Sequence, residues 1–190
     1  MLHIKLFPAE YGDCIILSIG KESQYNILID GGLSKTYHKY IKAEIQHIKE
    51  LGQKIGLMVC THMDNDHICG LIQVLKGTNF NFIENVWYNG FLQIVNSRFY
   101  SQKENIFTEK DNKILDEIIS QGMLLDVDQE VGINEGMSLG VLIEERRIPL
   151  NSAARGQAIC SELVKNKYEI APSIFITILG PSKDNIIELE

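Results

Sequence analysis

The stretch that decides the fold is CTHMDNDHICG, residues 60–70. The apolar run IGLMV at residues 55–59 precedes it and predicts a buried strand, whereas LIQVLK at residues 71–76 follows it and predicts the start of a helix. Within six residues the stretch contains two imidazoles and two carboxylates, those of His62, Asp64, Asp66 and His67. A strand, a loop of ligand-type side chains and a helix predict an α/β chain with a metal site after the strand.

The order of the four side chains suggests two metal positions. Alternate residues at the end of a strand point the same way, so His62 and Asp64 are placed to chelate one cation. Asp66 and His67, where the chain turns into the helix, would reach a second cation beside it. Nitrogen and oxygen ligands without thiolate suit zinc or manganese in a hydrolytic centre. A two-metal site activates water and clamps the attacking and leaving oxygens, and we predict that Asp66 orients that water and accepts its proton.

The alternative is a polar loop in which Asp66 caps the following helix. Capping needs one carboxylate and explains neither histidine, so the metal interpretation accounts for more of the motif. The flanking thiols of Cys60 and Cys69 could touch a metal, but core packing explains both.

The motif resembles the HxHxDH signature of the metallo-β-lactamase superfamily, in the HxDxDH form of the branch related to DNA-uptake competence proteins. YGDCIIL at residues 11–17, NILIDGG at residues 26–32 and HICGL at residues 67–71 resemble three further motifs of that branch, in the same order. The sequence departs from the commonest pattern at Asp64, where a second histidine is usual, and at Cys69, where glycine is usual. Asp64 is typical of the competence-like branch, and Cys69 replaces one small residue by another.

The resemblance implies an αββα sandwich, of which residues 1–190 would form the N-terminal half as one domain. It also implies further ligands, because a later histidine, a bridging aspartate and a final histidine complete such sites and no histidine follows His67. We therefore expect the rest of a longer polypeptide, or a partner chain, to complete the site. Since the branch contains deoxyribonuclease domains, we predict phosphodiester cleavage in DNA, with a bacterial antiviral defence protein as one setting for such an effector domain.

Five residues around the motif are expected to support its ligands. Gly31 and Gly32 allow a tight turn that approaches the metal loop, and Asp30 before them could orient a ligand histidine. An aspartate at a turn can equally accept backbone N–H groups. Asp13 and Thr61 lie in or next to the matching motifs and complete this set.

Composition limits the other function classes. The chain has 45% hydrophobic and 23% charged residues, as in ordinary globular domains, and its net charge of −7 argues against a broad basic surface for nucleic acid. The sequence predicts no membrane span and no signal peptide, so we expect a cytoplasmic protein. Four irregularly spaced cysteines fit reduced thiols better than a disulfide framework.

Periodicity and turn residues predict alternating strands and helices. We expect strands at residues 2–7, 13–19 and 24–30, and a strand that ends in a polar turn at residues 81–90. Helices are expected at residues 34–51, 108–121 and 152–166, a glycine-divided meander at 123–148, a buried strand at 173–179 and a helix capped by Ser182.

Two other functions remain open. The same chemistry could hydrolyse a small ester, lactone or amide, which would require a closed apolar pocket. A metal-free module that serves as a scaffold is the second alternative, since the ligand set is incomplete.

Overall fold

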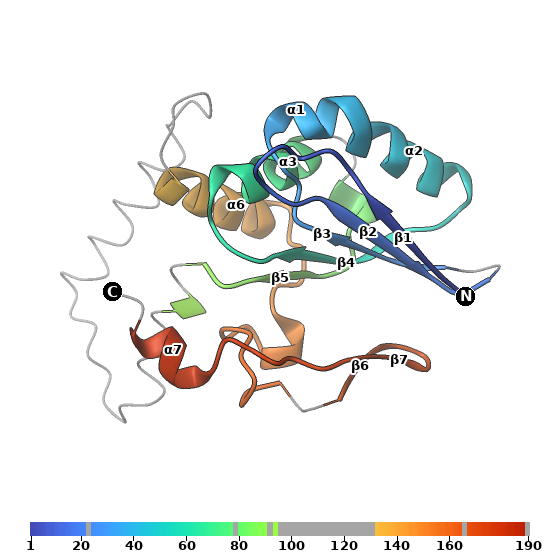
Figure 1. Ribbon diagram of the computed structural model, residues 1–190. Coiled ribbons are helices and arrows are strands. Elements are labelled where there is room, and N and C mark those ends of the chain that lie inside the picture. Colours follow the sequence, from blue (N-terminus) through green and yellow to red (C-terminus); the bar gives the residue numbers. More distant parts are fainter. Residues whose placement is uncertain (22–23, 78–79, 91–92, 95–131, 165–166, 189–190) are drawn as a thin grey trace.

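A five-stranded mixed sheet forms the centre of the molecule (Figure 1). The computed structural model describes all residues except 22–23, 78–79, 91–92, 95–131, 165–166 and 189–190. The strands lie side by side in chain order, and they are β1 (Leu2–Leu6), β2 (Ile15–Ile19), β3 (Tyr25–Ile29), β4 (Ile55–Cys60) and β5 (Val86–Tyr88). The prediction of an α/β chain is confirmed.

The sheet changes from antiparallel to parallel at β3. Strands β1, β2 and β3 form an antiparallel meander, whereas β4 pairs parallel with β3 and β5 pairs parallel with β4. Parallel neighbours need a long crossover, and a helix supplies each one here. The first consists of α1 (Ser34–Thr36), the π-helical turn η1 (Tyr37–Ile41) and α2 (Lys42–Glu50), and the second contains α3 (Asn65–Lys76).

The helices cover one face of the sheet. In Figure 1 α1, α2, α3 and α6 (Gly132–Glu145) lie above the strands. Alternate strand residues point to that side, so Ile16, Leu28 and Met58 pack beneath Ile41 and Leu71 in one fully buried core.

A second apolar cluster fills the opposite face. The strand side chains of Ile27, Leu57 and Trp87 contact Ile159 and Val164, which belong to the segment running beneath the sheet. That segment contains the 3₁₀ turn η3 (Ser152–Ala154), the hairpin of β6 (Tyr168–Ala171) and β7 (Ile174–Ile176), and α7 (Lys183–Glu188). A further 3₁₀ turn, η2 (Phe80–Phe82), precedes β5.

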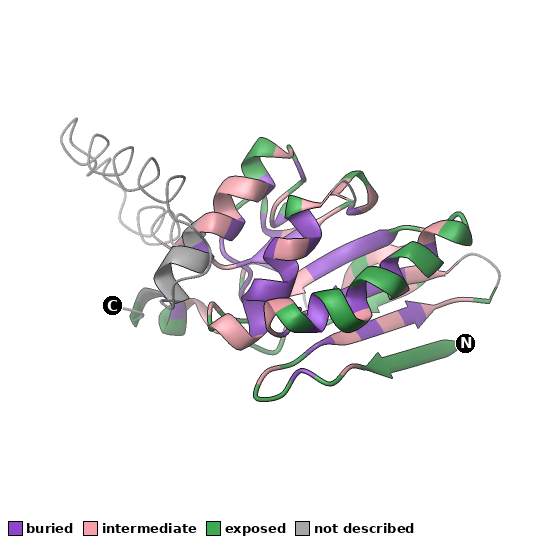
Figure 2. Cartoon of the chain, turned by 90° about the horizontal axis from the view of Figure 1, so that it is seen from above, coloured by how far each residue is buried: buried purple, intermediate pink, exposed green. Residues whose placement is uncertain are grey.

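Strand β1 leaves an apolar row exposed on this lower face. Leu2, Ile4 and Leu6 are 57%, 58% and 73% exposed. They pair with Ile19, Leu17 and Ile15, so the row continues the apolar surface of β2, and Figure 2 shows all of β1 as exposed.

The chain after residue 145 joins the sheet through two asparagine side chains. Leu150 forms a parallel bridge with Val86, and the buried amide of Asn151 then pairs with both main-chain groups of Tyr88, each at 2.8 Å. Asn89 pairs in the same way with Ile159, at 2.7 and 2.8 Å. These amides continue the hydrogen-bond ladder where regular strand pairing ends.

Three sequence expectations are wrong in the C-terminal half. Residues 132–145 form helix α6 and not a meander. Gly136 has no side chain, so the helix backbone can pack directly against Met63 and Tyr88. Residues 152–164 form turns and not a helix, since Asn151 and Asn89 hold this segment against β5. The expected buried strand at residues 173–179 is the short β7, whose Phe175 is 44% exposed.

Other boundaries agree more closely. The four N-terminal strands, the long helix after residue 34 and the strand before Asn89 are present, and Ser182 Oγ accepts a hydrogen bond from the Asn185 N–H at 3.1 Å as a helix cap does. The helix expected at residues 108–121 lies outside the described residues. Within the described chain, no helix has the length and apolar character needed to cross a membrane.

Candidate metal centre

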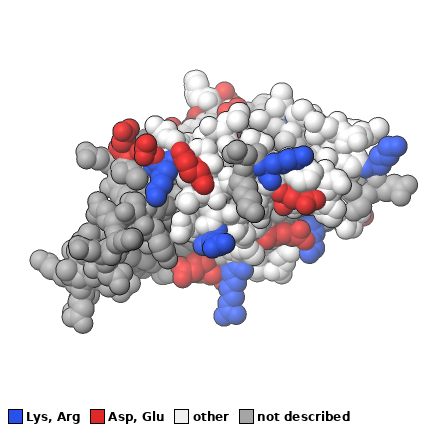
Figure 3. Space-filling view, turned by 90° about the horizontal axis from the view of Figure 1, so that it is seen from below, with Lys and Arg blue, Asp and Glu red and all other residues white. Residues whose placement is uncertain are grey.

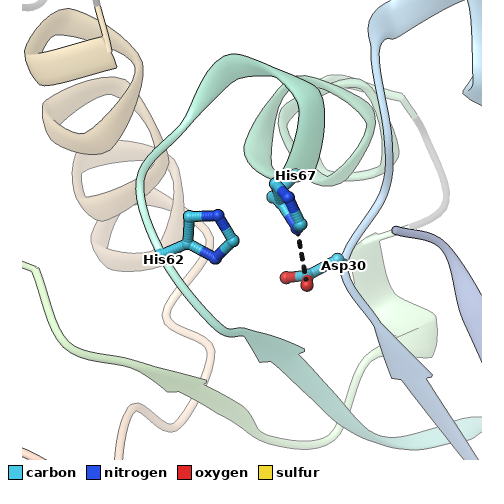
Figure 4. A group of neighbouring side chains, drawn as sticks. All are labelled: Asp30, His62 and His67. Carbon is cyan, nitrogen blue, oxygen red and sulfur yellow. Dashed lines mark hydrogen bonds and ion pairs between the residues drawn. The ribbon is translucent and has the colours of Figure 1, made fainter. Parts of the chain in front are cut away.

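The order of strand, loop and helix brings the candidate ligands to one edge of the sheet. The parallel strands β3 and β4 end side by side, so Asp30 after β3 lies next to the loop that follows Cys60. Figure 4 shows His62 on that loop and His67 on α3, with both imidazoles near the Asp30 carboxylate. One potential ligand atom from each of these three residues lies within 4.8 Å of the others.

Asp30 is the buried organiser of this group. Asp30 is 1% exposed and has a φ of 52°, and its N–H donates to the Val59 carbonyl at 2.9 Å. Its carboxylate accepts from the Thr61 N–H at 2.8 Å, the Thr61 hydroxyl at 2.6 Å and His67 Nδ1 at 3.0 Å. A left-handed conformation in a non-glycine residue is uncommon and is tolerated where the surrounding contacts fix it. Asp30 therefore combines both expected roles, accepting a backbone N–H and orienting a histidine.

His62 lies between an inner hydroxyl and an outer carboxylate. Its Nδ1 is 2.9 Å from Thr61 Oγ1, and its Nε2 is 3.5 Å from Asp64 Oδ2. The side chains of His62 and Asp64 are 46% and 77% exposed. This pair faces solvent.

His67 has the same arrangement in a buried position. Its Nδ1 faces Asp30, and its Nε2 is 3.8 Å from Asp66 Oδ2. The His67 side chain is 9% exposed and that of Asp66 is 27% exposed. The centroids of the His62 and His67 rings are 3.7 Å apart.

The distances within each histidine–carboxylate pair are near those expected for two ligands of one cation, although the three-residue group that converges consists of Asp30, His62 and His67 and includes neither Asp64 nor Asp66. Two ligand atoms on one tetrahedral zinc lie about 3.3–3.6 Å apart, because each bond is about 2.0–2.2 Å long. The Nε2–carboxylate distances of 3.5 Å at His62 and Asp64 and 3.8 Å at His67 and Asp66 are close to that range. Asp30 already accepts three hydrogen bonds, so the geometry favours an orienting role over direct ligation.

The helix start leaves the carboxylates available. Helix α3 begins at Asn65, so the expectation that Asp66 is its N-cap is wrong, and Asp66 lies in the first turn. Asp64 occupies the N-cap position, but its side chain makes no capping hydrogen bond. The Asp64 side chain is instead the one that faces His62 Nε2.

Close backbone contacts position the loop and helix. The Gly31 N–H donates to the His67 carbonyl at 2.7 Å, and the Gly70 N–H donates to the Gly32 carbonyl at 2.9 Å. A Cβ on Gly70 would lie 1.9 Å from the main-chain carbonyl oxygen of Gly31, and a Cβ on Gly12 would lie 1.6 Å from the main-chain carbonyl oxygen of Asp66. The sequence analysis missed this role of Gly12, for which the YGD motif was the available signal.

Asp13 supports the turn through its main chain. Its carbonyl accepts from the Gly32 N–H at 2.9 Å, and the residue is exposed. The structure thus brings Asp13, Gly31 and Gly32 together through backbone groups, and Asp30 and Thr61 through side chains.

Comparisons of the chain with protein-family models, with curated proteins and with solved structures found no match. The metallo-β-lactamase resemblance therefore stays a prediction from the quoted motifs, and the function is argued from the site.

The thiols beside the site are protonated core groups. The Cys60 thiol donates to the His62 carbonyl at 3.1 Å, and burial followed by the negative charge of Asp30 raises its pKa well above the usual range. The same two causes raise the pKa of Cys14 to about 12. Since a metal binds the thiolate form, these pKa directions support the packing role expected for Cys60.

Proposed function

We propose that this chain is part of a metal-dependent hydrolase with two divalent cations, zinc or manganese. His62 and Asp64 would bind one cation, and Asp66 and His67 the other. The observation that carries the proposal is the matched geometry of the two histidines, each of which has Nδ1 on an inner hydrogen-bond partner and Nε2 beside a carboxylate.

A bound divalent cation supplies acidified water and neutralises charge on the substrate. The protein's own contribution is orientation, because Asp30 and the Gly31–Gly70 contact fix the position of His67. Asp66 lies in the first turn of α3, and its side chain is 27% exposed. In this proposal it orients the attacking water and accepts its proton.

Phosphodiester cleavage in DNA is our proposed reaction. Exposure of His62 and Asp64 supports a site reached from an open surface, as a polymer requires. The net charge is −7, and Figure 3 shows intermixed basic and acidic side chains on the lower face. In this proposal the metals themselves would therefore supply the positive charge that attracts phosphate. The defence-protein setting rests only on the motif resemblance.

The two alternatives predict different surroundings. Hydrolysis of a small ester, lactone or amide would need a closed apolar pocket, and a 77% exposed Asp64 argues against one on the described side of the site. A metal-free scaffold would not need the buried Asp30 carboxylate to orient the His67 imidazole with Nε2 beside Asp66. Metal analysis separates this scaffold from both hydrolases.

We further propose that the sheet is one half of an αββα sandwich completed by the rest of a longer polypeptide or by a partner chain. The exposed row of Leu2, Ile4 and Leu6 supports this, because an apolar sheet face in contact with water is unfavourable. The missing metal ligands would come from the completing half.

The test begins with the metal content of the purified chain and of the longest natural polypeptide that contains it, followed by DNA cleavage by the longer form with manganese and with zinc. The Asp66→Asn variant keeps the side-chain volume and removes the charge, and Asp184→Asn, an exposed change on α7, is the matched control. We expect metal in the wild type and loss of cleavage in Asp66→Asn alone. Metal without DNA cleavage in the longer polypeptide would point to the small-molecule hydrolase, whereas absence of zinc and manganese binding in both forms would support the scaffold.

A further inference from the structure

The hydroxyl of Thr61 has two neighbours but only one proton. Thr61 Oγ1 lies 2.6 Å from Asp30 Oδ2 and 2.9 Å from His62 Nδ1. An ionised carboxylate only accepts hydrogen bonds, so the hydroxyl proton points to Asp30. The contact to His62 is then a hydrogen bond only if Nδ1 carries the proton and donates to Thr61.

The same reasoning applies directly to His67. Its Nδ1 lies 3.0 Å from the Asp30 carboxylate, which requires a proton on Nδ1. In both rings the Nδ1 proton leaves the Nε2 lone pair free, and Nε2 is the atom that faces Asp64 or Asp66.

We propose that Thr61 is a positioning residue that holds His62 in the Nδ1–H tautomer, so that one buried carboxylate, Asp30, orients both histidines. His67 is oriented directly and His62 through the threonine hydroxyl. The tautomer follows from the hydrogen bonds alone, whereas its consequence for metal affinity rests on the proposed function.

The backbone holds Thr61 in the position that this role requires. Its N–H and its hydroxyl bind the two oxygens of the same carboxylate, at 2.8 and 2.6 Å. The preceding residue is fixed too, because β4 pairs with β5 up to Cys60 and the Cys60 thiol binds the His62 carbonyl. The hydroxyl therefore meets His62 Nδ1 without rearrangement of the loop.

Removal of the hydroxyl should move the proton of His62. In Thr61→Val the side chain keeps its shape but offers Nδ1 no acceptor, whereas the Asp64 carboxylate still lies beside Nε2. The Nε2–H tautomer then keeps its neighbouring acceptor, whereas the Nδ1–H tautomer loses its acceptor. Thr61→Ser keeps the hydroxyl and is the matched control.

The experiment measures imidazole ¹⁵N chemical shifts in the metal-free protein, at a pH where those shifts show both rings to be neutral. We expect Nδ1–H for both histidines in the wild type and in Thr61→Ser. In Thr61→Val, His62 should shift towards Nε2–H while His67 stays unchanged as an internal reference. Zinc titration should show affinity about 10–100-fold lower in Thr61→Val and within about threefold of wild type in Thr61→Ser.

The outcomes separate this inference from the proposed function. An Nε2–H His62 in the wild type, or an unchanged His62 in Thr61→Val, would overturn the role of Thr61 even if metal binds. Absence of zinc and manganese binding in both this chain and the longer polypeptide, with the expected tautomers, would overturn the proposed function and leave the role of Thr61 intact. If Thr61→Val does not fold, the wild-type spectrum and Thr61→Ser still decide the tautomer.

Discussion

The Asp30 carboxylate lies 3.0 Å from Nδ1 of His67, so a hydrogen bond joins the end of β3 directly to the first turn of α3. Both groups are buried, and the same carboxylate also accepts the two donors of Thr61. The site thus depends on a contact between residues 37 positions apart in the sequence.

Asp30→Asn tests this organiser. The amide has one acceptor oxygen in place of two and brings an NH₂ group towards the donors of Thr61 and His67. We expect a loss of about 1–3 kcal/mol in the free energy of unfolding, because buried donors lose their partner. Zinc affinity should fall about 10–100-fold, since His67 is no longer oriented. Denaturant unfolding and zinc titration measure the two effects.

The control for Asp30→Asn is Asp64→Asn, which removes the same charge at a 77% exposed side chain. It should weaken zinc binding but change the free energy of unfolding by no more than about 0.5 kcal/mol. Equal stability losses in the two variants would show that Asp30 does not organise the fold as described.

Gly70→Ala tests the approach of α3 to the turn after β3. The new Cβ would lie 1.9 Å from the main-chain carbonyl oxygen of Gly31. The main chain cannot move aside as easily as the end of a flexible side chain. We expect destabilisation of about 1–3 kcal/mol by overpacking. Thermal unfolding monitored by circular dichroism measures it.

Gly140→Ala is the matched substitution for Gly70→Ala, because a Cβ on Gly140 in α6 meets nothing within 4 Å among the described residues. Removing an interior helix glycine should stabilise the protein by about 0.5–1 kcal/mol. If both alanine variants were stabilising, the close contact between Gly70 and Gly31 would be refuted.

Buried thiols predict a dependence of stability and reactivity on pH. Burial and the Asp30 charge raise the pKa of Cys14 from 9.0 to about 12. The folded state keeps the proton that the unfolded state loses, so this contribution to stability is fully present below pH 9 and is lost as the pH rises towards 12. The denaturant concentration at the midpoint of unfolding should therefore decrease as the pH is raised from 9 towards 12.

Thiol modification provides an independent measurement of this burial. All four cysteines are free and buried. We expect little reaction with a thiol reagent in the native protein at pH 8 and reaction of all four cysteines in denaturant, because the thiolate is the nucleophile. Fast native labelling of Cys14 or Cys60 would contradict their raised pKa values.

The sequence predicts the half of the fold in which local signals agree with tertiary packing. Alternating residues identify β2 and β3, and the apolar run before Cys60 identifies β4. The expected convergence of the motif also depends only on strands ending at one edge, so the neighbourhood of His62, His67 and Asp30 could be anticipated. The identity of any bound metal and the reaction stay predictions.

The remaining half depends on contacts that no local pattern contains. Glycine spacing suggested turns at residues 132–145. Gly136 is instead the point where α6 approaches Tyr88, because the Tyr88 hydroxyl donates to the Gly136 carbonyl at 2.8 Å. The helical spacing after residue 152 was misleading because the amide of Asn151, with φ 48°, holds the chain against β5. The link from Asp30 through Thr61 to His62 requires the loop conformation itself.

The exposed row on β1 yields the last prediction, a comparison of two isoleucines on adjacent strands. Ile16 on β2 points into the helix-covered core and is 0% exposed, whereas Ile4 on β1 points to the opposite face and is 58% exposed. Ile16→Ala should lower the free energy of unfolding by about 2–5 kcal/mol, because it leaves a cavity. Ile4→Ala should cost no more than about 0.5 kcal/mol, as expected for a surface position.

Denaturant unfolding of both variants, at two protein concentrations, gives this comparison directly. A small loss in Ile4→Ala would show that the lower face of β1 is in contact with water, as the proposal of a completing half requires. A loss comparable to that of Ile16→Ala would show that the row is covered in solution. Concentration dependence would then identify a second copy of the chain as the cover, since association stabilises the folded state by mass action.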